Sequence, residues 1–182
     1  RGLRRARAAS ALMLALPGSA YLYQGEELGL PEVIDLPDEA RQDPTWERSG
    51  HTRYGRDGCR VPIPWEAGAP AYGFSPSGAS WLPQPPEWAA LARDVQADDP
   101  NSTLALYRRL LEARREYALA AGALEWIDGF GDDVLAFRNG AVTVVANLGT
   151  GPIDLPDGEI VASSVAVDGQ VLPPDATAWL AM

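Results

Sequence analysis

Residues 17–32 of the chain read PGSAYLYQGEELGLPE. A Pro-Gly pair that breaks regular structure precedes the apolar run 20–23, and this run ends in the polar and acidic residues 24–27. The residues before it, 3–16, are rich in Ala, Leu and Arg, which favour a helix. The order of helix, tight break, buried strand and polar loop predicts the last turn of an alternating α/β barrel, where chemistry gathers at the carboxyl ends of strands.

The composition is that of a globular protein, with 46% hydrophobic, 8% aromatic and 22% charged residues in a chain of 182. The formal net charge of −10 argues against nucleic acid, because phosphate binding requires clustered Lys and Arg. The same charge disfavours anionic membrane surfaces and suits neutral ligands such as sugars. We therefore expect neither a nucleic-acid partner nor a membrane partner.

The sequence indicates no cofactor and no metal site. Cys59 is the single cysteine and His51 the single histidine, so that neither a disulfide nor a Cys/His metal cluster can form within the chain. The glycines are scattered through turns and form no phosphate-binding loop. This cysteine usage favours a cytoplasmic location.

The first 20 residues have two interpretations. Four arginines before an apolar stretch imitate a secretory signal peptide, and Gly18-Ser19-Ala20 imitates its cleavage site. The alternative is an amphipathic barrel helix with its arginines facing solvent, and we favour it because the next segment continues as a buried strand. No apolar stretch reaches the roughly 20 residues that span a bilayer.

The middle of the chain, residues 31–99, is a long loop rich in Pro, Gly and Trp. Loops of this length are usually functional, and the tryptophans indicate that this one is ordered. Short helices are expected around residues 38–46 and 86–95. A longer helix is expected over residues 99–121, with Asp99 as its cap, Pro100 in its first turn and Gly122 at its end.

The last 60 residues have strand character. Four apolar or β-branched runs, at 134–137, 142–146, 160–162 and 177–180, are separated by the turn pairs 139–140, 157–158 and 168–169, each an Asn-Gly or Asp-Gly. This spacing predicts a small antiparallel β-sandwich. Its aromatic residues could stack on sugars, but we favour packing in the core: Trp126, Phe130, Phe137 and Trp179.

A charged loop between these regions carries the candidate binding residues. Residues 55–65 read GRDGCRVPIPW, with two arginines around Asp57, followed by two prolines and Trp65. A guanidinium offers five fixed donors, which suit a carboxylate or the hydroxyl oxygens of a sugar. The alternative is an internal salt bridge between arginine and aspartate that pins the loop.

Two motifs resemble the α-glucosidases of glycoside hydrolase family 13. The loop is similar to the family pattern Arg-Asp-x-x-Arg-Thr/Val-Pro-Met-x-Trp, and it matches at Arg56, Asp57, Arg60, Val61, Pro62 and Trp65. Ile63 replaces the usual Met, which conserves volume. The segment 18–27 resembles the eighth-strand motif Gly-x-Pro-x-x-x-x-Gly-Glu-Glu, with Ala20 in place of the proline.

The resemblance implies an α/β plus all-β fold: the last part of a TIM (β/α)8 barrel, followed by a small antiparallel β-sandwich. Residues 1–121 would supply helix 7, strand 8, a long loop and helix 8 of the barrel, and residues 122–182 the sandwich. The family's nucleophile, acid/base and stabilising aspartate follow earlier strands, so we expect them before Arg1. No catalytic residue is assigned within the chain, and we expect the isolated chain to be inactive.

The resemblance also implies roles for single residues. Arg56 would bind the terminal glucose, and Arg60 would brace the loop by an ion pair. Asp57 would support the loop, and Trp65 would line the sugar site or pack in the interior. Glu26 and Glu27 are adjacent at a strand end and point to opposite faces, so a structural role is favoured over an acid/base pair.

The implied activity is removal of terminal α-linked glucose from oligosaccharides with retention. Two alternatives stay open: an accessory or carbohydrate-binding module of the same lineage, and a trehalose-forming or transglycosylating relative. The implied partners are an oligosaccharide substrate and either the rest of the barrel or a second copy of the chain.

Overall fold

The computed structural model describes all residues from Arg1 to Met182. It divides into two compact units, which we call the helix–sheet unit (residues 1–21 and 106–182) and the loop unit (residues 22–105). None of the helices has the length and apolar character required to cross a lipid bilayer.

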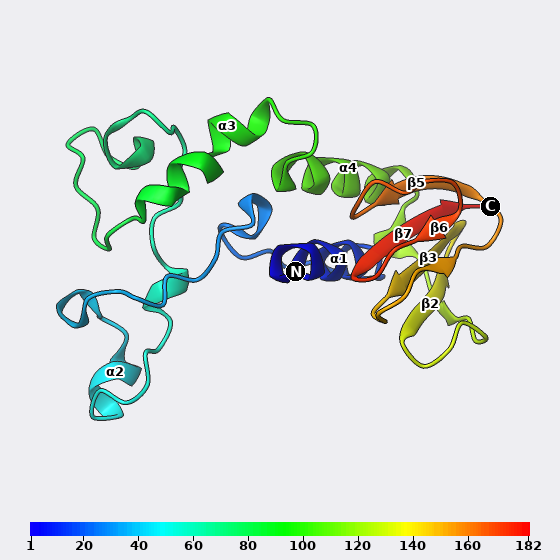
Figure 1. The fold of residues 1–182 in the computed structure, drawn as a ribbon, viewed down its shortest axis with the longest axis horizontal. Helices are drawn as coiled ribbons and strands as arrows, with labels where there is room; N and C mark the ends of the chain where they lie inside the picture. The colour runs from blue at the N-terminus through cyan, green and yellow to red at the C-terminus, as the bar shows by residue number, and fades with distance from the viewer. The chain divides into compact units, whose positions relative to one another are not determined.

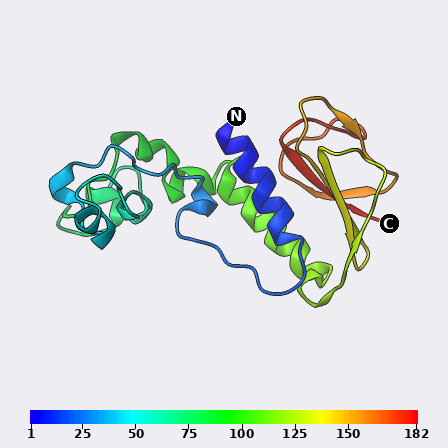
Figure 2. The same ribbon diagram turned by 90° about the horizontal axis from the view of Figure 1, so that it is seen from below.

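The helix–sheet unit combines two antiparallel sheets with two main helices. Helix α1 spans Gly2–Leu14, α4 spans Thr103–Glu116 from the end of the loop unit, and a 3-10 turn follows at Leu119–Ala121. In both ribbon views α1 and α4 lie side by side (Figures 1 and 2).

The five-stranded sheet has the order β1-β2-β3-β7-β5, and β4 pairs with β6 in a second sheet. The strands are β1 (Leu124–Trp126), β2 (Val134–Asn139), β3 (Val142–Asn147), β4 (Ile153–Asp154), β5 (Glu159–Ser163), β6 (Val171–Leu172) and β7 (Ala176–Ala181).

The strands predicted from the sequence are confirmed, and local chemistry explains them. The β2–β3 hairpin pairs Asn139 with Val142, and Gly140 in the turn has φ of 61°, a backbone conformation that glycine adopts without strain. Strands β2 and β3 alternate between two apolar cores. Phe137, Val144 and Trp179 face α1 and α4, whereas Ala136, Val145 and Leu180 pack against Leu155 and Leu172 on the other side. The predicted core position of Phe137 and Trp179 is confirmed, but Trp126 is 64% exposed.

Buried polar contacts fix α1 against β7. The Trp179 indole N–H donates to the carbonyl of Ala11 at 3.1 Å, and the Thr177 hydroxyl donates to the carbonyl of Ala8 at 2.9 Å. At the start of the helix, Arg5 donates to Asp175 at 2.8 Å. The Arg5 guanidinium lowers the pKa of the Asp175 carboxyl from its ordinary value.

The carboxyl end of α1 is closed by side chains from other elements. Arg114 of α4 donates to the carbonyls of Leu14, Leu16 and Gly18, and Asn139 of β2 donates to the carbonyl of Ala15 at 2.8 Å. A helix leaves its last carbonyls without partners inside the helix, and a cation there complements the helix dipole. Arg114 thus caps a neighbouring helix from the interior.

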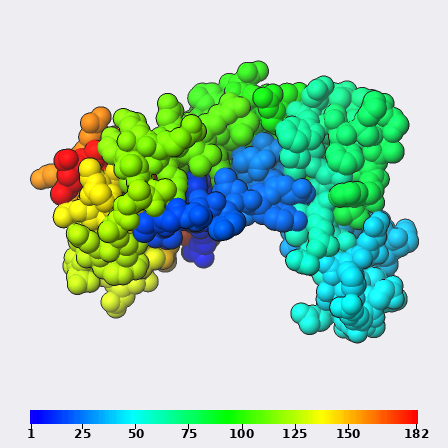
Figure 3. All heavy atoms as spheres, turned by 180° about the vertical axis from the view of Figure 1, so that it is seen from behind, coloured from blue at the N-terminus to red at the C-terminus, as the bar shows by residue number.

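The strand predicted over residues 20–23 is wrong. These residues form no strand, and no backbone hydrogen bond joins Ala20, Tyr21 or Leu22 to a neighbouring segment. Tyr21 is 84% exposed and Tyr23 is 48% exposed, and the segment runs along the surface in the space-filling view (Figure 3). A strand exists only through pairing, and no other segment of this chain pairs with the run.

The loop unit is built from short helices around a small core. Leu36, Val61, Leu82 and Trp88 form that core. The helices predicted around 38–46 and 86–95 are confirmed, each as two short pieces: Asp38–Ala40 and α2 (Pro44–Arg48) in the first region, and Pro86–Leu91 and α3 (Arg93–Ala97) in the second. Three further 3-10 turns lie at Glu26–Leu28, Asp57–Cys59 and Pro70–Gly73.

The long helix begins later than predicted. Helix α4 starts at Thr103, and the Ser102 hydroxyl, rather than Asp99, accepts the Ala105 N–H at 3.0 Å. Ser102 is held by the carbonyl of buried Gln96, whose own side chain accepts the Leu104 N–H at 3.2 Å and donates to the Leu28 carbonyl. The start of α4 is therefore set by a tertiary contact that the local sequence does not contain.

Candidate functional site

The arginine loop, residues 55–65, is packed tightly against the preceding segment. A Cβ on Gly58 would lie 2.5 Å from the Val33 carbonyl oxygen, and the Val33 N–H donates to the Gly58 carbonyl at 3.1 Å. A Cβ on Gly55, whose φ is +70°, would lie 2.7 Å from Asp43. Only glycine allows both close approaches.

Asp43, which precedes the arginine loop in sequence, pairs with both of its arginines. It is buried at the start of α2, where Oδ1 accepts the Thr45 N–H at 2.9 Å. Its Oδ2 lies 3.1 Å from Nη1 of Arg60 and 3.6 Å from Nε of Arg56. The Thr45 hydrogen bonds, together with those from the Arg56 backbone and the Arg60 charge, lower the pKa of Asp43 from 3.8 to about 2.

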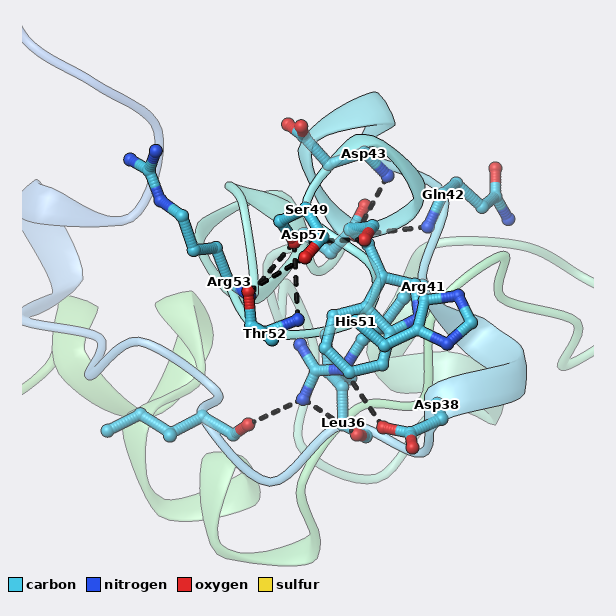
Figure 4. Close-up of polar contacts among 12 residues, drawn as sticks. Leu36, Asp38, Arg41, Gln42, Asp43, Ser49, His51, Thr52, Arg53 and Asp57 are labelled. Carbon is cyan, nitrogen blue, oxygen red and sulfur yellow. Dashed lines mark hydrogen bonds and ion pairs between the residues drawn. The ribbon is translucent and has the colours of Figure 1, made fainter.

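Asp57 has a structural role within the unit. It is 3% exposed, and its Oδ2 accepts the backbone N–H groups of Gln42 and Asp43 at 3.0 and 2.9 Å (Figure 4). The two arginines of the motif therefore pair with Asp43 and not with Asp57. The ion-pair partner of Arg60 is Asp43, a residue that the sequence analysis did not single out. The sequence does contain an indication of this role, because an aspartate followed by proline, as in Asp43-Pro44, is typical of a helix cap and the first helical position.

An aromatic cluster lies in the segment before the arginine loop. The Arg41 guanidinium lies 4.1 Å from the ring centre of Tyr54 and donates to the carbonyls of Ile34 and Leu36. Trp46 stacks on His51 with ring centres 4.7 Å apart and on Tyr54 at 5.7 Å. Figure 4 shows the Arg41 guanidinium with its contacts to the Leu36 carbonyl and to Asp38. All these side chains have partners between residues 34 and 54, so the cluster stabilises that segment.

The predicted binding residues lie at the surface of the unit. The Arg56 side chain is 75% exposed, and its charged end is held only by Asp43. Trp65 is 45% exposed within this chain. Its backbone N–H donates to Tyr72, and its carbonyl accepts the Asp94 N–H at the start of α3.

The loop unit contains at least two cavities. A smaller cavity of about 220 Å³ is lined by residues 23–26, 30–32, Gly58, Cys59, Val61, Ile63 and Trp88. A larger, more open cavity of about 400 Å³ is lined by residues 31–37 and 83–88. Arg56 lines neither of them.

Glu26 and Glu27 do not form a catalytic pair. Glu27 accepts the Gly25 N–H at 2.9 Å, which is the structural role predicted for it, while Glu26 is exposed. Between Arg1 and Met182, no three His, Cys, Asp or Glu side chains come together as metal ligands would. The side chains at the arginine loop offer guanidinium and carboxylate groups, which form hydrogen bonds and ion pairs.

The arginine loop, with Gly55 and Gly58, lies within the part of the chain that matches a protein family. The family profile described as "Alpha amylase, catalytic domain" matches residues 2–122, which is more than half of the chain. The chain belongs to the α-amylase family, glycoside hydrolase family 13. Its fold is accordingly related to the TIM barrel, with helices and an antiparallel sheet in the part present here.

Relatives within the family carry several activities in their names. A "Probable alpha-glucosidase" of Rhizobium meliloti is 41% identical over 124 residues, which cover 68% of this chain and 22% of that protein. The "Trehalose synthase/amylase TreS" of Mycobacterium tuberculosis is 34% identical over 135 residues, covering 70% of this chain and 20% of that protein. The chain thus spans about a fifth of the length of these relatives.

Solved structures agree in fold. The α-glucosyl transfer enzyme XgtA superposes with a TM-score of 0.75 at 36% identity, covering 97% of this chain and 36% of that one. The trehalulose synthase MutB from Pseudomonas mesoacidophila superposes with a TM-score of 0.80 at 22% identity, covering 98% and 38%.

Proposed function

We propose that the chain is the C-terminal part of a retaining α-glucosidase that removes terminal α-linked glucose from oligosaccharides. The observation that supports this proposal most is the family match over residues 2–122, which includes the arginine loop held by Asp43. The 41% identity to a relative named as an α-glucosidase favours hydrolysis of α-glucosides. The catalytic carboxylates would be supplied by barrel strands outside this chain.

Within this function, Arg56 would bind the terminal glucose, with Asp57, Arg60 and Trp65 supporting its loop. The Arg56 guanidinium is 75% exposed and retains free donors, since Asp43 contacts only its Nε. The buried contacts of Asp57 and Arg60 hold the backbone on which Arg56 stands. This arrangement suits a residue that reaches out to a substrate bound by other strands.

We further propose a domain boundary near residue 121, with barrel elements before it and a β-sandwich over residues 122–182. The family profile ends at residue 122, close to this boundary. The sheet β1-β2-β3-β7-β5 and the pair β4-β6 enclose an apolar core that includes Leu155 and Leu172. Two sheets facing each other across such a core support the sandwich.

The activity is tested by comparing the purified 182-residue chain with the longer gene product that contains it. The chain alone should release no aryl group from an aryl α-glucoside, and the longer protein should release it with retained configuration. In the longer protein, Arg56→Ala should raise KM and Arg53→Ala, an exposed neighbour, should not. Turnover by the rigorously purified chain would overturn the proposal.

Association is tested on the same material. The exposed run Tyr21–Tyr23 has unpaired backbone groups and predicts that the chain binds complementary barrel protein or a second copy of itself. Solution scattering should report such a complex. A compact monomer at all concentrations would contradict the proposed partners.

Transfer of a glucosyl group is the second candidate. Its support is the 36% identity to XgtA, an enzyme named for α-glucosyl transfer, and the similarity to a trehalose synthase. With maltose as the only substrate, products larger than glucose would favour transfer over hydrolysis in the longer protein.

A further inference from the structure

We infer that the smaller cavity of the loop unit binds one neutral sugar ring, with Gln24 as a hydrogen-bonding residue. The inference rests on the proposed function for its class of ligand, but it concerns a place in the structure that Arg56 does not reach. The cavity lies where the run 20–23 passes into the loop unit, against Gly58 and Cys59 of the arginine loop.

One side of the cavity is polar and has unused hydrogen-bonding capacity. Tyr23, Gln24, Glu26 and Glu32 line it, and none of their side chains has a hydrogen-bond or ion-pair partner within the protein. A phenol and an amide donate and accept, whereas the two carboxylates accept. Sugar hydroxyls also donate and accept, so this set complements a hydroxylated ring.

The other side is apolar and rigid. Leu30, Val61, Ile63 and Trp88 line it, and Val61 and Trp88 are 1% and 2% exposed. The indole N–H of Trp88 is a buried donor without a hydrogen-bond partner. Buried polar groups in native proteins are nearly always hydrogen-bonded, so this donor, on a residue that lines both cavities, is available to a ligand that supplies an acceptor.

The volume of the smaller cavity, and a comparison with the larger one, indicate which ligand it binds. About 220 Å³ is below the roughly 300–1,000 Å³ of pockets for drug-sized ligands, and it suits a single ring. The larger cavity has the carboxylates of Glu32, Asp35 and Glu87 among prolines, and the amide N–H of its Gln84 already donates to Pro62. Glu32 and the Trp88 indole line both cavities, but the larger one lacks the phenol of Tyr23 and the amide of Gln24 and adds only the carboxylates of Asp35 and Glu87, so it matches hydroxyl groups less well.

Cys59 allows binding to be measured directly. It is the only cysteine of the chain, it is partly exposed, and it lines the smaller cavity. A thiol reagent should label Cys59 of the 182-residue chain more slowly when glucose, maltose or isomaltose is present. The labelling rate should fall by the factor 1 + [L]/Kd, which is about tenfold at ten times Kd. An acyclic polyol at equal concentration controls for viscosity, and labelling in urea gives the rate of the unfolded chain.

Two variants of exposed residues locate the effect. Gln24→Ala should weaken protection about two- to tenfold, the usual loss for one hydrogen bond, while Glu87→Ala, which lines only the larger cavity, should leave it unchanged. The inference is overturned if no sugar protects Cys59, if the polyol protects equally, or if Gln24→Ala protects as well as the original sequence. None of these outcomes touches the proposed activity, which is decided by turnover of the aryl α-glucoside in the longer protein.

Discussion

The single residue Asp43 links helix α2 to the arginine loop. One carboxylate caps α2 through Thr45, accepts the backbone N–H of Arg56, and pairs with the guanidinium of Arg60. A carboxylate that accepts several hydrogen bonds favours its charged form, and this explains its lowered pKa. The loop therefore depends on one negative charge that lies outside the recognised motif.

Acid should weaken this loop in a defined range of pH. The pKa of Asp43 falls from 3.8 to about 2 on folding, so its contribution to stability is complete only above 3.8 and is lost as the pH falls toward 2. The Tm of the unchanged protein should therefore fall as the pH is lowered from about 5 to about 2, with most of the change between the two pKa values. Asp43→Asn should have a lower Tm at neutral pH and a flatter pH dependence, whereas Asp35→Asn, at an exposed carboxylate without partners, should behave like the original.

The close approach of Gly58 to Val33 gives a second residue-scale prediction. Gly58→Ala places a Cβ 2.5 Å from a backbone oxygen, and the overpacking should lower the free energy of unfolding by about 1–3 kcal/mol. Gly68→Ala is the matched control, because a Cβ there meets nothing within 4 Å. Urea unfolding measures both, and equal midpoints for the two variants would contradict the described packing.

At the scale of elements, α1 is held at both ends by side chains far away in sequence. Asp175 binds the arginines of its first turns, and Arg114 with Asn139 binds its last carbonyls. Arg114 is 9% exposed, and its charge faces carbonyls at and just beyond the end of α1 rather than a carboxylate. Helix α1 is thus stabilised mainly by its surroundings, as expected for a short helix.

Removal of the cap should therefore loosen α1. Arg114→Met keeps most of the apolar stem but leaves three carbonyls without their donor, and we expect a loss of about 2–3 kcal/mol in stability. The exposed neighbour Arg115→Met should change stability little. Hydrogen exchange in α1 should rise only in the first variant, and unchanged protection there would argue against the cap.

The sequence predicted those elements that local chemistry determines. The hairpin strands around Asn139-Gly140 and the helices α1 and α4 follow from turn residues and helix propensity. The run Tyr21–Tyr23 was misassigned because a strand needs a partner strand, which propensity does not report. The start of α4 and the role of Asp43 depend on Gln96 and on the arginines, which are distant in sequence.

At the scale of the whole molecule, the two units differ in what stabilises them. The helix–sheet unit has a continuous hydrogen-bonded sheet and a large apolar core, while the loop unit has short turns around four core residues. Local stability follows such differences in buried apolar contact. We expect the loop unit to unfold first.

The tryptophans make this order measurable. Trp46, Trp65, Trp81 and Trp88 lie in the loop unit, and Trp126 and Trp179 in the helix–sheet unit. In urea, the change in tryptophan fluorescence should begin at lower concentration than the loss of far-UV circular dichroism, which reports mainly the helices and the sheet. Coincident transitions would show a single cooperative unit instead.

The apolar core that α1 shares with the sheet limits where a truncated form of the protein can begin. Ala11 and Leu14 lie in the matched catalytic region, yet they pack on Phe137 and Trp179 beyond its end. A clone that starts at Gly122 would strip the sheet of its covering helix and leave the Trp179 indole without its acceptor. Such a product should be insoluble when expressed, so the sugar affinity of the sheet is better measured with residues 1–21 retained.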